Sequence, residues 1–466
     1  MVIIMKLSKI QNFVIIALVI ATVVQTVKLW LYDNDGHNFF YTVFADFIND
    51  GSTYSGETYI LEPSSIITGY GNKKFSKFYC ESDNSGIYDL GNDGIKELFS
   101  KGEFLEKSQL DWDSFLISKC LIFKYSQSFN INDFETSFGK NKDLKNDFNF
   151  NSILIYPQMN YGSTLKISFV DLEKEESYNY KITSSKVSKD IYDAIEKRQN
   201  NEIKSDNQIT YISTKQSGFN IFYDNVFVPQ WTENQIEYSL LKRINPFEQN
   251  GDFSVSIFES YIDDFFDNST SKWSEVNEQG GYLFSDDNTV VKYSVTGLLE
   301  YFNYKAVDEN VEESFIKSYS AAKNFIKSDN SLKTDIYLEN WYKENDEYIF
   351  CFNYTVNNMP LIPSDILKEM NNLDYCIEIS VKNNSVRKYR RIAYNYEKEN
   401  KTGLINKEFI KALDETVMIN YQNSGGSIVT NVDDIKLAYY MSGKDSIKLR
   451  WFTTINNNVY SVSCEK

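Results

Sequence analysis

Histidine is almost absent from this chain of 466 residues, since His37 is its one example. Histidine triads, His-rich zinc sites and histidine acid–base pairs therefore need residues that the sequence lacks or places badly. A GxSxG elbow, a phosphate-binding glycine loop and a Rossmann fingerprint are also missing. We predict that His37 is a surface residue, that the protein is not an enzyme, and that it binds no metal or cofactor. Acidic pairs such as Asp263–Asp264 are numerous, but 65 acidic residues produce such pairs by chance. A carboxylate-based cell-wall hydrolase is therefore the less favoured alternative, because no pair has the apolar surroundings that acid–base work needs.

Paired cysteine motifs are missing as well. No two of the five cysteines have a CxxC spacing, which argues against a zinc ribbon or a thioredoxin-like site. Cys351 and Cys376 lie in two successive strand-like runs and would bridge if those strands pair. Buried free thiols are the favoured interpretation, because an odd count fits an exported disulfide framework poorly. The cysteines are Cys80, Cys120, Cys351, Cys376 and Cys464.

Positive charge is in deficit, with 48 Lys and Arg against 65 Asp and Glu and a formal net charge of −17. A nucleic acid is excluded as a partner, because phosphate binding needs a basic surface. Proline is scarce at 6 residues, whereas 34 Tyr and 33 Phe recur in short alternating runs with Ile. These runs predict domains rich in β-sheet.

Long apolar stretches are missing except for one at the N-terminus, residues 13–31. Nineteen residues are just enough for a helix to cross a hydrocarbon core of about 30 Å. Lys6 and Lys9 precede the segment, and Trp30 and Tyr32 lie at its far end. This pattern predicts a single membrane helix with a cytoplasmic N-terminus and the bulk of the chain outside the cell.

Two alternatives compete with a retained anchor. A cleaved signal peptide is one, with Val19-Ile20-Ala21 as a weak cleavage site. The apolar character continues through Val27 and Leu31, which is longer than a signal core needs. The other alternative is a buried helix of a cytosolic domain, and the apolar residues on all faces of the segment argue against it.

The predicted fold class is α+β, with antiparallel sheets on which helices pack. We divide the chain into a cytoplasmic tail at 1–12, a membrane helix at 13–31, and extracytoplasmic α+β domains at 32–205, 206–330 and 331–466. A polar segment, 197–208, is expected to form a loop near the first boundary.

An internal repeat supports a relationship between the last two domains. The strand-like NTVVKY at 288–293 is echoed by NSVRKY at 384–389. Each copy is followed by an amphipathic helix and then by a hairpin-like pair of strands. The apolar stripe of the first helix begins at Val311, and that of the second begins at Ile405. Chance similarity in a chain rich in Tyr, Asn and Lys is the alternative.

The anchor with its TVKLW exit and HNFFY, the repeated V-x-K-Y strands and the closing run LRWFTTINNNVYSV together resemble the YycH proteins. Members of that family are membrane-anchored accessory regulators of the essential cell-wall two-component system of low-GC Gram-positive bacteria. The resemblance implies one membrane helix, three extracytoplasmic domains of which the last two are similar, and no catalytic residues. It also implies contact with a sensor histidine kinase and a YycI-like co-regulator.

The candidate partner-contact residues lie within the membrane segment. Thr22, Gln25 and Thr26 share one helical face, and Leu29 continues the same stripe. A polar side chain in hydrocarbon gains by finding a partner, so this face is a candidate contact with the kinase or the co-regulator. The alternative is that Gln25 and Thr26 mark the start of the membrane interface. An envelope ligand-binding or sensing module is the second candidate function for the whole chain.

Overall fold

The computed structural model describes residues 59–79, 86–138, 147–158, 164–203, 209–223, 225–231, 236–266, 272–276, 281–305, 313–426, 428–429, 431–442 and 446–465. The chain divides into two compact units, and nearly all of these residues belong to the one formed by 53–303 and 309–466. A search of the described helices finds none with the length and apolarity needed to span a membrane. The predicted membrane segment, 13–31, lies outside the described residues.

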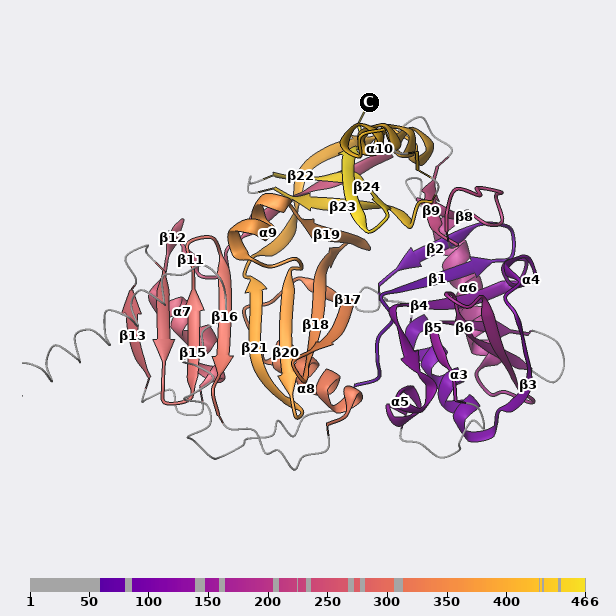
Figure 1. Cartoon of the computed structure of the whole chain (residues 1–466), viewed down its shortest axis with the longest axis horizontal. Coiled ribbons are helices and arrows are strands. Elements are labelled where there is room, and N and C mark those ends of the chain that lie inside the picture. The colour runs from indigo at the N-terminus through magenta and orange to yellow at the C-terminus, as the bar shows by residue number, and fades with distance from the viewer. Residues whose placement is uncertain are drawn as a thin grey trace, which may run out of the picture. The chain divides into compact units, whose positions relative to one another are not determined.

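Nine antiparallel strands form the first sheet, in the order β3-β7-β6-β5-β4-β1-β2-β8-β9 (Figure 1). Helices α3 (Ile87–Lys101) and α6 (Ser188–Ile203) pack against each other and against this sheet. The strands are β1 (Ser65–Tyr70), β2 (Phe75–Phe78), β3 (Glu103–Gln109), β4 (Lys119–Asn130), β5 (Asn149–Pro157), β6 (Leu165–Asp171), β7 (Glu176–Ile182), β8 (Thr210–Ser213) and β9 (Phe227–Gln230), with short helices α4 (Trp112–Leu116) and α5 (Ile131–Thr136).

Spacing explains why the two longer helices lie on the sheet. In α6, Ile191 and Ile195 are four residues apart and fully buried. In α3, the buried stripe includes Gly91, where an added Cβ would lie 2.4 Å from the Cζ atom of Phe123 on β4. The glycine therefore allows the helix to approach the sheet closely.

We expect Gly91→Ala to destabilise the protein. Alanine gains about 1 kcal/mol of helix propensity over glycine, but overpacking a core costs about 1–3 kcal/mol. The Gly94→Ala change is the matched comparison, because its Cβ would lie 3.0 Å from the flexible Cδ2 of Leu165. Urea unfolding should show a larger loss for Gly91→Ala than for Gly94→Ala, and equal effects would contradict this account of the close approach.

Fourteen strands form the second sheet, and its main path is β13-β14-β15-β16-β21-β20-β18-β19-β23-β24-β10-β22. Strand β17 pairs with β18, and β25 pairs with β24. The strands are β10 (Ile236–Ile244), β13 (Trp273–Val276), β14 (Tyr282–Ser285), β15 (Thr289–Tyr293), β16 (Leu298–Asn303), β17 (Asp335–Glu344), β18 (Glu347–Val356), β19 (Met359–Pro363), β20 (Ile377–Lys382), β21 (Ser385–Ile392), β22 (Asn395–Ile405), β23 (Asp434–Met441), β24 (Ser446–Ile455) and β25 (Asn458–Ser463).

Helix α8 (Phe315–Ser328) covers β18, β20 and β21, and α10 (Phe409–Asn423) covers β24 and β25 (Figure 1). Strands β19 and β23 pair in parallel, which joins the part of the sheet under α8 to the part under α10. The remaining elements are α7 (Val255–Ile262), the 3-10 turn η2 (Asp263–Phe265), α9 (Asp365–Asn371) and the small hairpin of β11 (Glu248–Gln249) and β12 (Asp252–Phe253).

Asparagine fixes the tight turns of this sheet. Four hairpins each turn on two residues with positive φ, and seven of the eight are asparagine. Two-residue turns of this kind match the right-handed twist of paired strands, and asparagine tolerates the left-handed region better than most residues. The pairs are Asn345–Asp346, Asn357–Asn358, Asn383–Asn384 and Asn456–Asn457.

The structure agrees with the coarse α+β prediction and with the element order of the two repeat units. Both NTVVKY and NSVRKY lie on strands, and each unit then runs strand, helix, strand, strand. The echoed strands β15 and β21 flank the same strand, β16, so they lie in one sheet rather than in separate ones. The relationship between the two halves by an internal repeat stays a prediction.

Three details differ from the sequence prediction. Ile405 is the last residue of β22 and not part of the second helix, because β22 continues its pairing with β10 to that residue. The expected loop at 197–208 is helical through Ile203, since α6 extends past its last buried isoleucine. Strands β8 and β9 belong to the first sheet, so the predicted boundary at 205–206 falls within that sheet. Val311 lies outside the described residues.

The described cysteines confirm the favoured interpretation of buried free thiols. Cys120, Cys351, Cys376 and Cys464 are all free and buried. Burial raises the pKa of the Cys120 and Cys376 thiols to about 12, which keeps them protonated and unreactive. Cys80 lies outside the described residues.

Candidate functional site

The predicted partner-contact residues are not placed by the structure. Thr22, Gln25, Thr26 and Leu29 lie outside the described residues, and so does His37. Within the described ranges, no three His, Cys, Asp or Glu side chains are grouped so that they could hold a metal ion. The site that the structure does bring together is a polar cleft.

The cleft has a volume of about 660 Å³ and lies between the first sheet and the second. One wall comes from β2, from Tyr79 directly after it, and from β4, and it includes Lys77 and Lys124. The opposite wall comes from β17 and β23, and it includes Glu339 and Lys436. The further lining includes charged groups and a few apolar side chains. Its hydroxyls and amides are Ser64, Ser65, Ser126, Gln127, Asn340, Asn353, Thr454 and Asn457, and its other charged groups are Lys368, Asp374, Asp433 and Asp434.

Direct contacts between the two sheets hold the walls of the cleft in place. The rings of Tyr79 and Tyr337 have centroids 4.3 Å apart, and both side chains are buried. The Gln127 amide donates to Asn340 Oδ1 at 2.8 Å. A backbone hydrogen bond also joins the two parts: the N–H of Val432, just before β23, donates to the carbonyl of Ile221, between β8 and β9, at 2.9 Å.

A buried ion pair adds to this junction. Lys323 Nζ, on α8, lies 3.0 Å from Glu62 Oε2, just before β1. Both side chains are largely buried, which makes the pair less screened by salt than a surface pair.

Opposite charges face one another inside the cleft. Lys436 Nζ lies 3.3 Å from Glu339 Oε1, and both side chains are partly exposed. Burial alone would raise the pKa of Glu339, but Lys436 and hydrogen bonding hold it below its ordinary value. Burial likewise would lower the pKa of Lys436, and Glu339 and Asp434 raise it above its ordinary value. The pair therefore stays ionised at neutral pH.

Lys77 differs from the paired Glu339 and Lys436. No hydrogen bond or ion pair of its ammonium group is found among the described residues. Burial between the walls lowers the pKa of Lys77 to about 8, with Lys436 and Lys124 lowering it further and Asp434 and Glu339 opposing them. At neutral pH the cleft therefore holds a largely protonated lysine without a partner.

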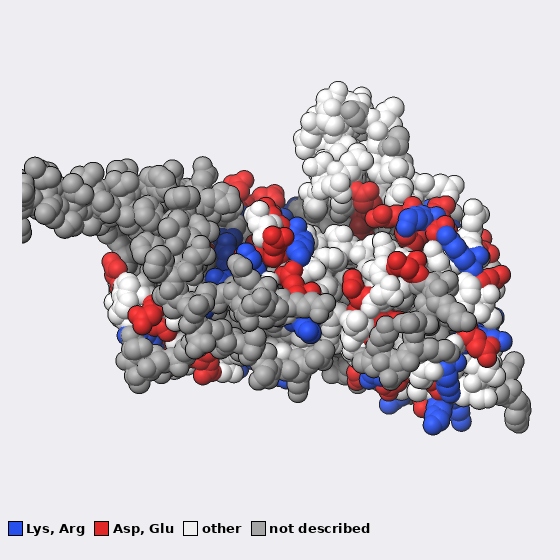
Figure 2. All heavy atoms as spheres, turned by 60° about the horizontal axis from the view of Figure 1, so that its bottom comes forward, with Lys and Arg blue, Asp and Glu red and all other residues white. Residues whose placement is uncertain are grey.

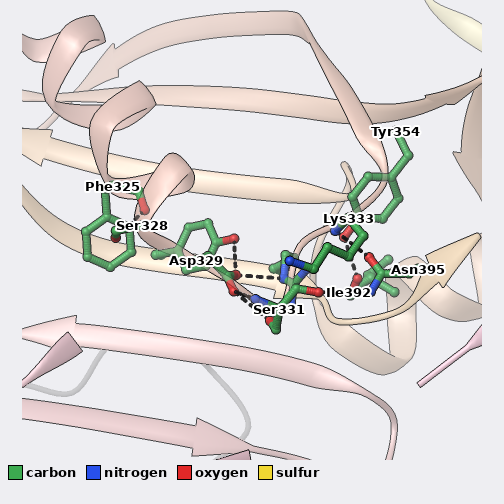
Figure 3. A network of polar contacts seen from close by, with 10 residues as sticks. Phe325, Ser328, Asp329, Ser331, Lys333, Tyr354, Ile392 and Asn395 are labelled. Carbon is green, nitrogen blue, oxygen red and sulfur yellow. Dashed lines mark hydrogen bonds and ion pairs between the residues drawn. The ribbon is translucent and has the colours of Figure 1, made fainter. Parts of the chain in front are cut away.

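A second polar constellation lies beneath α8 and has a structural character (Figure 3). Arg391 of β21 is fully buried, and its Nε lies 3.2 Å from Asp329 Oδ2 at the end of α8. Tyr389 donates its hydroxyl to the same carboxylate at 2.9 Å, and Ser331 donates to Asp329 Oδ1 at 2.6 Å. These contacts fix the end of α8 to the sheet. A pocket of about 420 Å³, smaller than the cleft, is lined by Asp329 together with Glu62 and Lys323.

Sequence reasoning did not find the cleft. Its charged residues come from strands that lie more than 350 positions apart in the chain, at Lys77 and Lys436. On the face drawn in Figure 2, acidic and basic side chains of the described residues are interspersed, so no patch of one sign marks a site there.

The fold, and not the sequence, relates this chain to a known protein. No protein-family model matches the sequence, and no curated protein matches it. The crystal structure of YycH from Bacillus subtilis superposes with a TM-score of 0.54 at 12% identity, and covers 88% of this chain and 98% of that one. The chain has the YycH fold. At 12% sequence identity, this structural match shows the fold alone, and it does not show the function.

Two other solved structures are less similar. An uncharacterized protein from Eubacterium rectale covers 51% of this chain at 14% identity, with a TM-score of 0.30. The C-terminal domain of YpeB from Bacillus megaterium covers 45% at 9% identity, with a TM-score of 0.22.

Proposed function

We propose that this chain is a single-pass membrane protein that regulates a sensor histidine kinase of a cell-envelope two-component system. The observation that carries the proposal is the YycH fold, which spans nearly the whole of the solved YycH chain. The apolar segment 13–31 supports it from the sequence, as the anchor that would place the two sheets outside the cytoplasm. Regulation, and not catalysis, is the role.

Regulation would act as a population shift of the kinase. An accessory protein changes a kinase equilibrium only by binding one of its states more tightly than the other. Equal affinity for both states shifts nothing, however tight the binding is. Contacts of the membrane helix and of the extracytoplasmic sheets, with the kinase and with a YycI-like co-regulator, would supply this difference in affinity.

The membrane face carries the first prediction of this proposal. Replacing Thr22, Gln25 and Thr26 by Leu removes polar groups that would hydrogen-bond across helices, each worth about 1 kcal/mol or less. We expect recovery of the kinase from mild detergent to fall several-fold, while the protein itself stays in the membrane. The matched control replaces Val23, Val24 and Val27 by Leu, and a loss equal to that of the polar triple would assign the effect to packing.

Photo-cross-linking from full-length protein in membranes tests the proposal as a whole. A photoreactive residue at Thr22 or Leu29 should capture a histidine kinase or a co-regulator. Capture of neither, with the protein shown to be in the membrane, would overturn the partner assignment. A sensing role is the second candidate, and the polar cleft is the observation that favours it.

A further inference from the structure

The cleft has the size of a site for a small molecule. Its volume of about 660 Å³ lies within the range of about 300–1,000 Å³ that is typical of ligand sites. Its walls are held by contacts from both sheets, so the space is a feature of the fold and not of one loop. Charged groups, hydroxyls and amides make up much of the lining beside a few apolar side chains, which favours a ligand that is itself rich in hydrogen-bonding groups.

Four charged side chains of the cleft, namely Lys77, Lys368, Asp374 and Asp434, make no hydrogen bond or ion pair among the described residues, and two of them come from strands of the opposite walls. The Lys77 ammonium comes from the first sheet, and the Asp434 carboxylate comes from β23 of the second. No hydrogen bond or ion pair of either side chain is found among the described residues, although each lies within electrostatic range of the other. Their neighbours Glu339 and Lys436 pair instead with each other.

An unpaired lysine between close walls costs free energy that an exposed lysine does not. The depressed pKa of Lys77 reflects this cost, because burial disfavours its charged form. An anionic group of a ligand beside Lys77 would stabilise the charged ammonium and so offset the cost of its burial. A simple anion would meet Asp434 and Glu339, and a simple cation would meet Lys77, Lys124 and Lys436. A ligand with both charges avoids both repulsions.

We propose that the cleft binds a small zwitterion of the short-peptide class, with its carboxylate on Lys77 and its ammonium on Asp434. The amides and hydroxyls of the lining, including Gln127 and Asn353, would hydrogen-bond the peptide backbone between the two ends. This site stands on the cleft alone, so it does not depend on the proposed partner of the protein.

The probe is alanylalanine, bound to the full-length protein in detergent and followed by calorimetry. The free dipeptide should bind, and its N-acetyl and C-amide forms should each bind about tenfold or more weakly, since each lacks one charge-assisted contact. The D,D and L,L forms separate cell-wall peptides from protein-derived peptides as the source. Absence of binding by the free forms, or equal binding of the blocked forms, overturns the proposal.

Variants assign the two ends. Lys77→Gln should weaken binding of the free dipeptide about tenfold or more and leave binding of the C-amide unchanged, because the C-amide lacks the carboxylate. Asp434→Asn should weaken binding of the free dipeptide by a similar factor and leave binding of the N-acetyl form unchanged, because that form lacks the ammonium. Lys73→Gln in the turn before β2 and Asp346→Asn in a hairpin turn are the matched controls, because both residues are exposed. Undiminished binding by Lys77→Gln overturns the assignment.

A measurement on the unaltered protein covers the case of a variant that fails to fold. Lys77 should react with acetic anhydride with a pH midpoint near 8, because burial lowers its pKa. The free dipeptide should protect Lys77 and shift this midpoint upward, because a carboxylate favours the charged ammonium. Labelling of Lys77 that the dipeptide leaves unchanged contradicts the site.

Discussion

Asp329→Ala should destabilise the protein by about 3–5 kcal/mol, the cost of leaving a buried charge without its partner. Arg391 would be that charge, because it is fully buried and the Asp329 carboxylate lies 3.2 Å from its Nε. The same change removes the acceptor of the Tyr389 hydroxyl and of Ser331. Urea unfolding of the full-length protein, followed by tryptophan fluorescence, measures the loss.

The matched control is Asp287→Ala, an exposed aspartate near β15, which should change stability by no more than about 0.5 kcal/mol. Removing both charges, as Asp329→Leu with Arg391→Met, should cost less than Asp329→Ala alone, because no ion is then left unpaired. A loss below about 1 kcal/mol for Asp329→Ala would show that solvent reaches Arg391, and would contradict its burial.

Trp451→Ala should have an effect of similar size, about 3–5 kcal/mol, because it empties a large core site. Trp451 lies on β24 with no exposed surface, and its indole N–H donates to the Lys407 carbonyl at 2.8 Å. Its ring stacks on Trp231, which follows β9, with centroids 6.1 Å apart. The side chain therefore joins the end of the first sheet to the second.

Two comparisons separate the contributions at Trp451. Trp273→Ala removes the same side chain from a position that is 54% exposed, and should cost far less. Trp451→Phe keeps most of the volume and loses the hydrogen bond, so it should fall between the wild type and the alanine variant. Equal losses for the alanine variants at 451 and 273 would contradict the packing described for β24.

The local elements could be predicted from the sequence because they depend on short-range patterns. The four-residue spacing of Ile191 and Ile195 indicates α6, and the runs at 335–342 and 347–356 indicate the β17–β18 hairpin. The antiparallel sheets with covering helices follow from the same alternation. The resemblance to YycH rested on layout, and the fold agrees with it.

Long-range pairing could not be predicted in this way. Strand β10 pairs with β22 and β24, although more than 150 residues separate it from β22. The parallel pairing of β19 with β23 joins two parts of the sheet that no local pattern connects. The cleft depends on both sheets, and two of its unpaired charges, Lys77 and Asp434, become a pair of neighbours only in the folded chain.

The two proposals fit one another without depending on one another. A ligand that binds in the cleft would contact both sheets, and so it would change the free energy of any rearrangement between them. Such a change is the differential interaction that a regulator needs in order to favour one state of its partner. Peptide binding without any effect on a kinase would leave the cleft proposal standing and would remove the regulator proposal.

The phosphorylation of a partner kinase tests the central claim most directly. The kinase captured by cross-linking is reconstituted in lipid vesicles, alone, with the full-length chain, and with the chain that carries the Leu triple at Thr22, Gln25 and Thr26. We predict that the wild-type chain changes the rate of kinase autophosphorylation several-fold, and that the triple variant restores the rate of the kinase alone. A rate that is the same in all three vesicles, with equal protein incorporation, would contradict the account.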